Sequence, residues 1–140
     1  MVSVTGVWTS PGKNSGRMTS QERVRAVAGH GLDGCAHARP RSKRQVLFAS
    51  AEHLEAVGVE PGQIRENFTV SGADVRSWSI GQRLRVGEAT FEVTMVCDPC
   101  PRMDELRPGL QAELEGRRGM LARVLETGDV THGDEVELLP

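Results

Sequence analysis

The chain has 140 residues, of which 38% are hydrophobic and 26% charged, and its formal net charge is −2. This length predicts one domain, residues 1–140, that buries roughly two thirds of the unfolded chain's surface, and the composition excludes a disordered protein. The small net charge gives no global attraction to nucleic acid, and no apolar run is long enough to cross a membrane. The first ten residues lack the basic and apolar regions of a signal peptide, so we expect a cytoplasmic protein with reduced thiols.

The first half of the chain predicts short strands separated by loops. Strands are expected at residues 2–8, 24–28, 45–48 and 68–70, where β-branched and aromatic residues gather between turn-forming residues. The stretch TSPGKNSGRMTSQ, residues 9–21, predicts a mobile surface loop. Ser50 can cap a short helix that runs to Val57 and stops at Gly58.

The second half alternates polar and apolar residues more clearly. In RLRVGEATFEVTMV, the apolar positions from Leu84 to Met95 share one face, and Gly87-Glu88 predicts the tight turn of a hairpin. A helical region is expected from about Pro101 to Leu114, interrupted near Pro108. A second hairpin, residues 120–131, and a last strand, residues 135–139, complete the chain. Together these elements predict a mainly β fold, a distorted closed β-barrel with two or so short helices.

Arginine is used far more than lysine. Of 17 basic residues only Lys13 and Lys43 are lysine. A GC-rich genome accounts for such a bias, but arginine forks also match phosphate and carboxylate groups. A site for a small anionic ligand is therefore compatible with the composition.

The stretch CDPCPRM contains two of the three cysteines, Cys97 and Cys100. The C-x-x-C spacing alone suggests a thioredoxin-like redox pair. However, Pro101 keeps Cys100 out of the helical region and is itself well suited to the first helical position. This pattern places Cys100 at the N-cap of the next helix, where its thiolate is favoured, and disfavours the thioredoxin geometry. Cys97 is expected to be a buried residue at the end of a strand, and an inert structural Cys100 stays open.

Zinc is a further alternative for these cysteines. Cys35 and His37, together with Cys97 and Cys100, would complete a Cys₃His set. The C-x-H spacing is shorter than in most structural zinc pairs, and the two segments would have to meet in space. The sequence therefore disfavours zinc, and Cys35 is expected to be structural.

Five motifs in chain order carry a family resemblance. They are GLDGCAHA, RENFTVSG, IGQRLRVG, EVTMVCDPC and GRRGMLARVLETGDVTHGD. With them the chain resembles a stand-alone MOSC domain, the module found at the C-terminus of molybdenum cofactor sulfurases. Cys35 stands where the family usually has aspartate, which puts any role of that carboxylate in doubt.

The resemblance implies a distorted β-barrel in which Cys100 is the functional thiol, as a sulfur (persulfide) carrier or as a ligand to molybdenum in a pterin cofactor (molybdopterin). Related domains belong to reductases of N-hydroxylated compounds, and others are coupled to pyridoxal-phosphate cysteine desulfurase domains. The implied activity is thus a sulfur transferase or a cofactor-dependent reductase, with a cysteine desulfurase or a molybdoenzyme as partner. The alternative is a non-catalytic binding module for a small anion, and either a monomer or a homodimer is compatible with the fold.

Several other residues are candidates for the same site. His37 follows a glycine-rich segment and can act as a base or donor near Cys100. Arg123 shares a strand face with Leu121 and Leu125, so its guanidinium needs an anionic partner: a ligand, or Glu66 or Asp134 in a buried ion pair. Asn67 is expected to tie down a turn or to bind a ligand. The candidate cofactor-binding residues are Arg65, Asn67, Arg102, Arg118 and Arg123, and the run Arg39, Arg41, Lys43 and Arg44 is either a solvated loop or a phosphate-binding patch.

Overall fold

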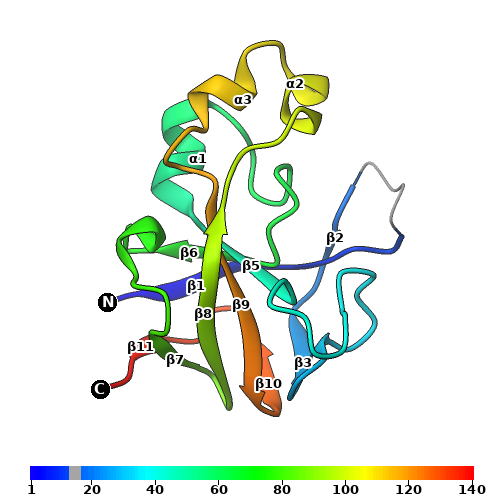
Figure 1. The fold of residues 1–140 in the computed structure, drawn as a ribbon, viewed down its shortest axis with the longest axis vertical. Coiled ribbons are helices and arrows are strands. Elements are labelled where there is room, and N and C mark those ends of the chain that lie inside the picture. The colour runs from blue at the N-terminus through cyan, green and yellow to red at the C-terminus, as the bar shows by residue number, and fades with distance from the viewer. Residues whose placement is uncertain (13–16) are drawn as a thin grey trace.

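The computed structural model describes residues 1–12 and 17–140, and strands make up most of its regular structure (Figure 1). The strands are β1 (Ser3–Thr9), β2 (Thr19–Ser20), β3 (Arg23–Val27), β4 (Gly31–Leu32), β5 (Val46–Ser50), β6 (Phe68–Ser71), β7 (Arg83–Val86), β8 (Ala89–Cys97), β9 (Gly119–Glu126), β10 (Gly128–Thr131) and β11 (Val136–Leu138). The helices are α1 (Ala51–Val57), α2 (Arg102–Leu106), α3 (Leu110–Glu113) and the 3-10 helix η1 (Val75–Ser77). The mainly β prediction is confirmed.

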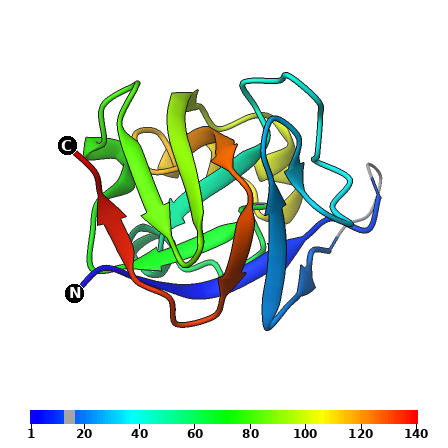
Figure 2. The same ribbon diagram turned by 90° about the horizontal axis from the view of Figure 1, so that it is seen from below.

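The strands form two sheets. Eight lie in the order β11-β7-β8-β9-β5-β6-β1-β2, and three lie in the order β10-β3-β4. Seen from the end away from the helices, the strands surround the core (Figure 2). The chain before β11 returns beside β1, where the backbone N–H of Val4 donates to the Asp134 carbonyl at 2.8 Å, but only a single bridge, Ser3 to Glu135, forms there. The strand pairing is not closed, so the closed barrel is not confirmed.

One of the two predicted hairpins is present. β7 and β8 pair across the Gly87-Glu88 turn, with Val86 opposite Ala89. The second hairpin is wrong, because β10 pairs with β3 and not with β9. Gly128, the first residue of β10, lies against the turn between β7 and β8. A Cβ there would lie 2.3 Å from the Glu88 carbonyl oxygen, so this close approach requires glycine.

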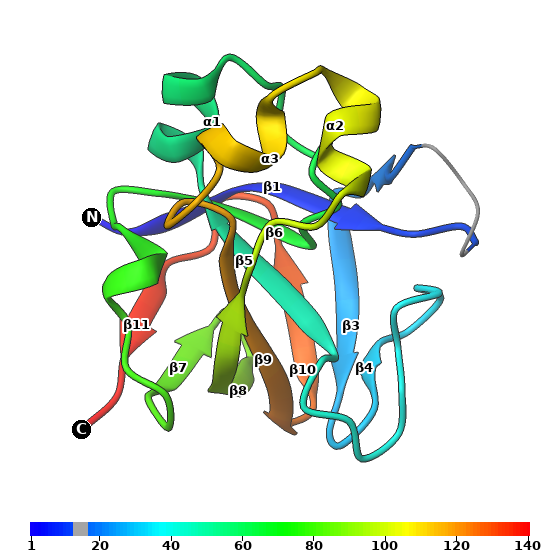
Figure 3. The same ribbon diagram turned by 45° about the horizontal axis from the view of Figure 1, so that its top comes forward.

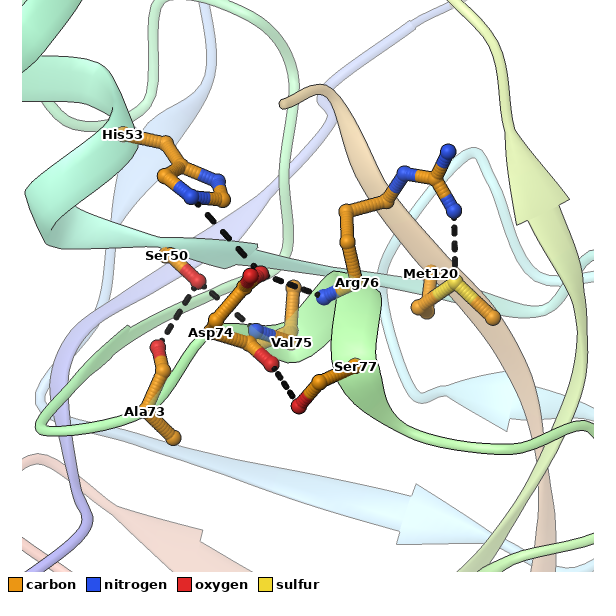
Figure 4. A network of polar contacts seen from close by, with 8 residues as sticks. All are labelled: Ser50, His53, Ala73, Asp74, Val75, Arg76, Ser77 and Met120. Carbon is orange, nitrogen blue, oxygen red and sulfur yellow. Dashed lines mark hydrogen bonds and ion pairs between the residues drawn. The ribbon is translucent and has the colours of Figure 1, made fainter. Parts of the chain in front are cut away.

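The three α-helices lie where the sequence predicted helices, whereas the 3-10 helix η1 was not predicted. α1 stops at Gly58, whose φ is 74°, and the helical region after the cysteines divides into α2 and α3 on either side of Pro108. Ser50 stands at the N-cap of α1, but its hydroxyl makes no cap. It donates to the Ala73 carbonyl at 2.8 Å and accepts from the Val75 N–H at 2.9 Å, which fixes η1 against β5 (Figure 4).

The loop expected over residues 9–21 is shorter than predicted. Thr9 belongs to β1 and Thr19–Ser20 forms β2, with Trp8 opposite Ser20. Residues 13–16 of the expected loop lie outside the described residues. Within the described ranges, none of the helices is long and apolar enough to cross a membrane.

Three apolar clusters hold the fold together. The main core is centred on Phe48, whose ring lies 5.1–5.6 Å from those of Phe68, Phe91 and Trp78. A second cluster joins α1, α2 and α3, which gather at one end of the molecule, to β5 (Figures 1 and 3). The third cluster consists of Leu47, Cys97 and Leu121 on the outer face of three neighbouring strands, β8, β9 and β5.

Candidate active site

A bulge in β8 decides which way Cys97 points. Val93 lies opposite Ala122, and two residues later Met95 lies opposite the next residue of β9, Leu121. The extra residue reverses the alternation of faces. Met95, expected on the core face with Leu84, packs instead with Leu121, so that prediction is wrong. Cys97 follows it to the outer face.

A cavity of about 480 Å³ lies over this outer face. Its volume is within the range typical of small-molecule sites. Its floor contains Leu47, Cys97 and Leu121, and its walls come from the loop before β5, the turn before β6 and the segment between β8 and α2. The predicted residues that line it are His37, Arg39, Arg44, Arg65, Asn67, Cys97, Cys100, Arg102 and Arg118.

The charge of the cavity wall is strongly one-sided. Five lining residues are arginines and one, Asp98, is an acid. Arg39, Arg44 and Arg102 are exposed at the rim, so two of the four residues in the predicted basic run reach the cavity. Gln45 fixes that run to the sheet, because its Nε2 donates to the Arg39 carbonyl at 3.2 Å and its Oε1 accepts from the Val124 N–H at 2.9 Å.

Arg118 is the most buried of these arginines, with 7% of its surface exposed. Its Nη2 donates to the Ile64 carbonyl at 2.7 Å, and its Nη1 lies 3.4 Å from the Asp98 carbonyl. Its Nε is buried and has no acceptor among residues 1–12 and 17–140, and within those ranges no carboxylate forms an ion pair with it. A buried cation held only by carbonyl groups favours an anion beside it.

Arg65 and His37 face each other across the cavity wall. Arg65 has a left-handed backbone, with φ of 69°, and its Nη2 donates to the Ser10 hydroxyl at 2.9 Å. The same Nη2 lies 3.4 Å from Nε2 of His37. Burial, followed by the charge of Arg65, lowers the pKa of His37 below its usual value. The neutral imidazole is therefore favoured at pH 7, so His37 can accept a hydrogen bond or a proton.

Asn67 is buried and pins the turn before β6. Its Oδ1 accepts from the Leu47 N–H at 3.0 Å, and its Nδ2 donates to the Trp8 carbonyl at 3.1 Å. The same Nδ2 lies 3.5 Å from Sγ of Cys35, which also accepts from the Ser10 N–H at 3.2 Å. Both residues thus support the cavity wall from behind, and Asn67 also lines it.

Cys97 and Cys100 both line the cavity but differ in environment. Cys97 is buried, and burial raises the pKa of its thiol. Cys100 is half-buried. The backbone from Asp98 to Cys100 forms no turn, and an extended segment of this kind separates the two Cα atoms by about 9 Å. Since a disulfide needs less than about 7 Å, the geometry does not suit a redox pair.

Cys100 precedes the helix less closely than expected. The N-cap of α2 is Pro101, and α2 has only five residues, so the N-cap assignment is wrong by one position and a helix terminus adds little here. The backbone N–H of Met103 still donates to the Cys100 carbonyl at 2.9 Å. In the described part of the chain, no three His, Cys, Asp or Glu residues are placed to hold a metal ion.

Arg123 does not belong to the cavity. It shares a face with Leu121 and Leu125 as predicted, but that face is the outer one, and Arg123 is exposed. Its Nη2 lies 2.7 Å from Oε1 of Glu92 on β8, so its partner is neither Glu66 nor Asp134. A simple alternation pattern does not distinguish which of its two faces is the core.

Glu66 is a buried residue whose importance the sequence alone did not indicate. Its Oε2 accepts from the Gly62 N–H at 2.9 Å and from the Thr69 hydroxyl at 2.8 Å, while its buried Oε1 has no partner in the described ranges. Burial raises the pKa of this carboxyl, and the Gly62 and Thr69 hydrogen bonds oppose that shift. Glu66 holds the turn that carries Arg65. In the sequence, only its position between the two candidate residues Arg65 and Asn67 could have indicated this structural role.

Solved structures of other proteins share this fold. The YUAD protein from Bacillus subtilis is 21% identical, with a TM-score of 0.80, over 99% of this chain and 96% of that chain. YiiM from Geobacillus stearothermophilus is 18% identical (TM-score 0.78, 100% of this chain and 76% of that chain), and YiiM from Escherichia coli is 19% identical (TM-score 0.74, 99% and 68%). At these identities the likeness shows the fold alone. No curated protein matches the chain.

The family itself is given by a sequence model. The model described as "MOSC domain" matches residues 19–137, which include every lining residue of the cavity. The resemblance noted from the five motifs is thereby confirmed. The chain belongs to the MOSC domain family.

Proposed function

We propose that this MOSC protein binds a phosphate-bearing small molecule in the arginine-lined cavity and uses the Cys100 sulfur in a transfer or ligation step. The observation that carries the proposal is the buried guanidinium of Arg118, which lines the cavity and forms no ion pair in the described ranges. The buried Glu66 carboxyl feels its charge only from beyond ion-pair distance. The excess of five arginines over one acid supports the same ligand charge.

In the sulfur-carrier form of the proposal, Cys100 accepts sulfur from a donor persulfide. The Cys100 sulfur attacks the terminal sulfur of the donor, a new S–S bond forms at Cys100, and the S–S bond of the donor breaks. The donor leaves as a thiol, so one sulfur atom is transferred and no external oxidant or reductant is needed. His37 lines the same cavity and is neutral because its pKa is lowered, so it is the proposed acceptor of the Cys100 proton; it would take that proton on Nε2, which requires Arg65 to turn away.

In the cofactor form, Cys100 would ligate molybdenum and the arginines would hold the phosphate of the pterin. The residues fit such a group: a thiol is a soft ligand, Arg118 supplies a buried guanidinium and Arg65 a half-buried one in the cavity wall. When bound, the group would supply two-electron redox chemistry at the metal. The chain's own contribution would be to orient the ligand, neutralise its charge and keep water from the Cys100 side.

The alternative is a binding module in which Cys100 is structural. It is favoured by the packing of Cys100 against the cluster that joins the helices to the sheet. In that case the anion would bind, but no chemistry would depend on the thiol. A cysteine desulfurase or a molybdoenzyme is the proposed partner only for the thiol-dependent forms.

Mass spectrometry and metal analysis test these forms together. After incubation with a cysteine desulfurase and cysteine, the sulfur carrier should gain about 32 Da, one sulfur atom, at Cys100. The gain should vanish in Cys100→Ser and persist in Cys97→Ser, the matched control from the same cavity. Molybdenum in protein purified from a host that makes molybdopterin would support the cofactor form. Absence of both signals would leave the binding module.

A further inference from the structure

Arg118 bridges two backbone segments that carry the site, and the two bonds are unequal. The bond from Nη2 to the Ile64 carbonyl is short, at 2.7 Å, and Ile64 directly precedes Arg65. The bond from Nη1 to the Asp98 carbonyl is long, at 3.4 Å, and Asp98 is two residues before Cys100. A hydrogen bond weakens with distance, so the Asp98 contact is the weaker of the two.

Few side-chain hydrogen bonds hold the segment that carries Cys100. Arg118 contacts the Asp98 carbonyl, as described above. Gln111 contacts the next carbonyl: its Nε2 lies 3.4 Å from the Pro99 oxygen. Cys97 adds only a long contact of 3.9 Å from its Sγ to the Asp98 oxygen. The side-chain hydrogen bonds described for the segment between the end of β8 and the start of α2 are therefore three, and all are long. The one short bond is the backbone bond that the Cys100 carbonyl accepts from the Met103 N–H at 2.9 Å.

An anion in the cavity would compete for the same guanidinium. Arg118 lines the cavity, and an anion there that accepts from Nη1 would take the place of the Asp98 carbonyl, whose contact is the longer of the two. The short bond to Ile64 would remain as the pivot. The Asp98 carbonyl would lose its partner.

We propose that Arg118 is a positioning residue that couples anion binding in the cavity to the mobility of the Cys100 segment. With the cavity empty, Arg118 restrains Asp98 and hence Cys100. With an anion bound, the restraint is released and Cys100 becomes more accessible. This inference rests on the proposed function in one respect only, that an anion binds in this cavity.

The test measures alkylation of Cys100 by neutral iodoacetamide, with and without inorganic phosphate, while calorimetry measures phosphate binding. In the wild type, phosphate should accelerate Cys100 alkylation about threefold, the factor that one weak hydrogen bond contributes to an equilibrium. Arg118→Lys keeps the charge but cannot bridge two carbonyls with a rigid fork. It should bind phosphate and lose the acceleration. Arg123→Lys, exposed and outside the cavity, is the matched control and should keep the acceleration.

The direction of the effect distinguishes coupling from shielding. Slower alkylation in the presence of phosphate would mean that the anion only covers Cys100, and it would overturn the inference. Equal acceleration in Arg118→Lys would also overturn it. No phosphate binding to the wild type by calorimetry would refute the anion site itself, and with it the proposed function. If Arg118→Lys does not fold, hydrogen exchange of wild-type residues 98–103 decides: phosphate should increase it, and a decrease would contradict the coupling.

Discussion

Nη2 of Arg65 lies 3.4 Å from Nε2 of His37 in the wall of the cavity. A guanidinium only donates hydrogen bonds, so Nε2 accepts and the proton of the neutral imidazole is on Nδ1. Protonation of His37 would replace this contact with one between two cations. The lowered pKa of His37 expresses that cost together with the cost of burial.

This relationship predicts how stability depends on pH. Because the folded pKa of His37 lies below its unfolded value, the unfolded chain binds more protons as the pH falls through about 6.5. The free energy of unfolding should therefore fall between pH 7 and pH 5. His37→Gln should flatten this part of the profile in urea titrations, whereas the exposed control His132→Gln should not. An unchanged slope in His37→Gln would contradict the assignment.

For Glu66 we expect the opposite pH dependence of stability. Its folded pKa is raised, so the folded chain binds more protons than the unfolded chain above about pH 4.5, and stability should decline as the pH rises through the folded pKa. Glu66→Gln keeps an oxygen for Gly62 and Thr69 and should remove this decline. The exposed control Glu137→Gln should keep the wild-type profile. Glu66→Ala should lose about 1–3 kcal/mol, because it leaves the Gly62 donor unpaired.

Gly119 is expected to tolerate no side chain. A Cβ there would lie 2.1 Å from the Phe48 carbonyl oxygen, and the residue has φ of 143°. Gly119→Ala should cost about 3 kcal/mol or more, since it forces β5 and β9 apart beneath the cavity. Gly133→Ala, where nothing lies within 4 Å of the added Cβ although φ is also positive, is the comparison. Equal losses of unfolding free energy would show that backbone strain alone, and not the clash, is responsible.

Arg44 lines the cavity over the outer sheet face, whereas Arg123 lies on the same face outside the cavity, so the two arginines test where the anion binds. Arg123→Ala removes an exposed ion pair and should change stability by less than about 1 kcal/mol. Its dissociation constant for phosphate should stay at the wild-type value. Arg44→Ala should weaken phosphate binding about threefold, as expected for one exposed charge. If Arg123→Ala raised the dissociation constant and Arg44→Ala did not, the anion would bind near Arg123 and not in the cavity, which would contradict the proposed site.

The sequence predicted most of the strands, but not β2 or β4, together with the split helical region and nine residues that line the cavity. Alternation, proline positions and the motifs are local signals, which is why these predictions succeeded. The prediction failed where one residue changes the outcome. The bulge between Val93 and Met95 turns Cys97 outward, and the crossing at Gly128 sends β10 to the other sheet. Neither leaves a mark in a period-two pattern. Arg123 was misplaced for a different reason: both faces of β9 carry apolar residues, so the alternation does not show which face is the core.

Native mass spectrometry of freshly purified protein tests the central claim most directly, that the cavity holds an anionic ligand next to a working thiol. The wild type should carry additional mass, either sulfur at Cys100 or a phosphate-bearing ligand. Cys100→Ser should lose the sulfur, and Arg118→Gln should lose the ligand. A bare polypeptide mass in the wild type, with no phosphate binding and with Cys100 no more reactive than Cys35 and Cys97, would contradict the account.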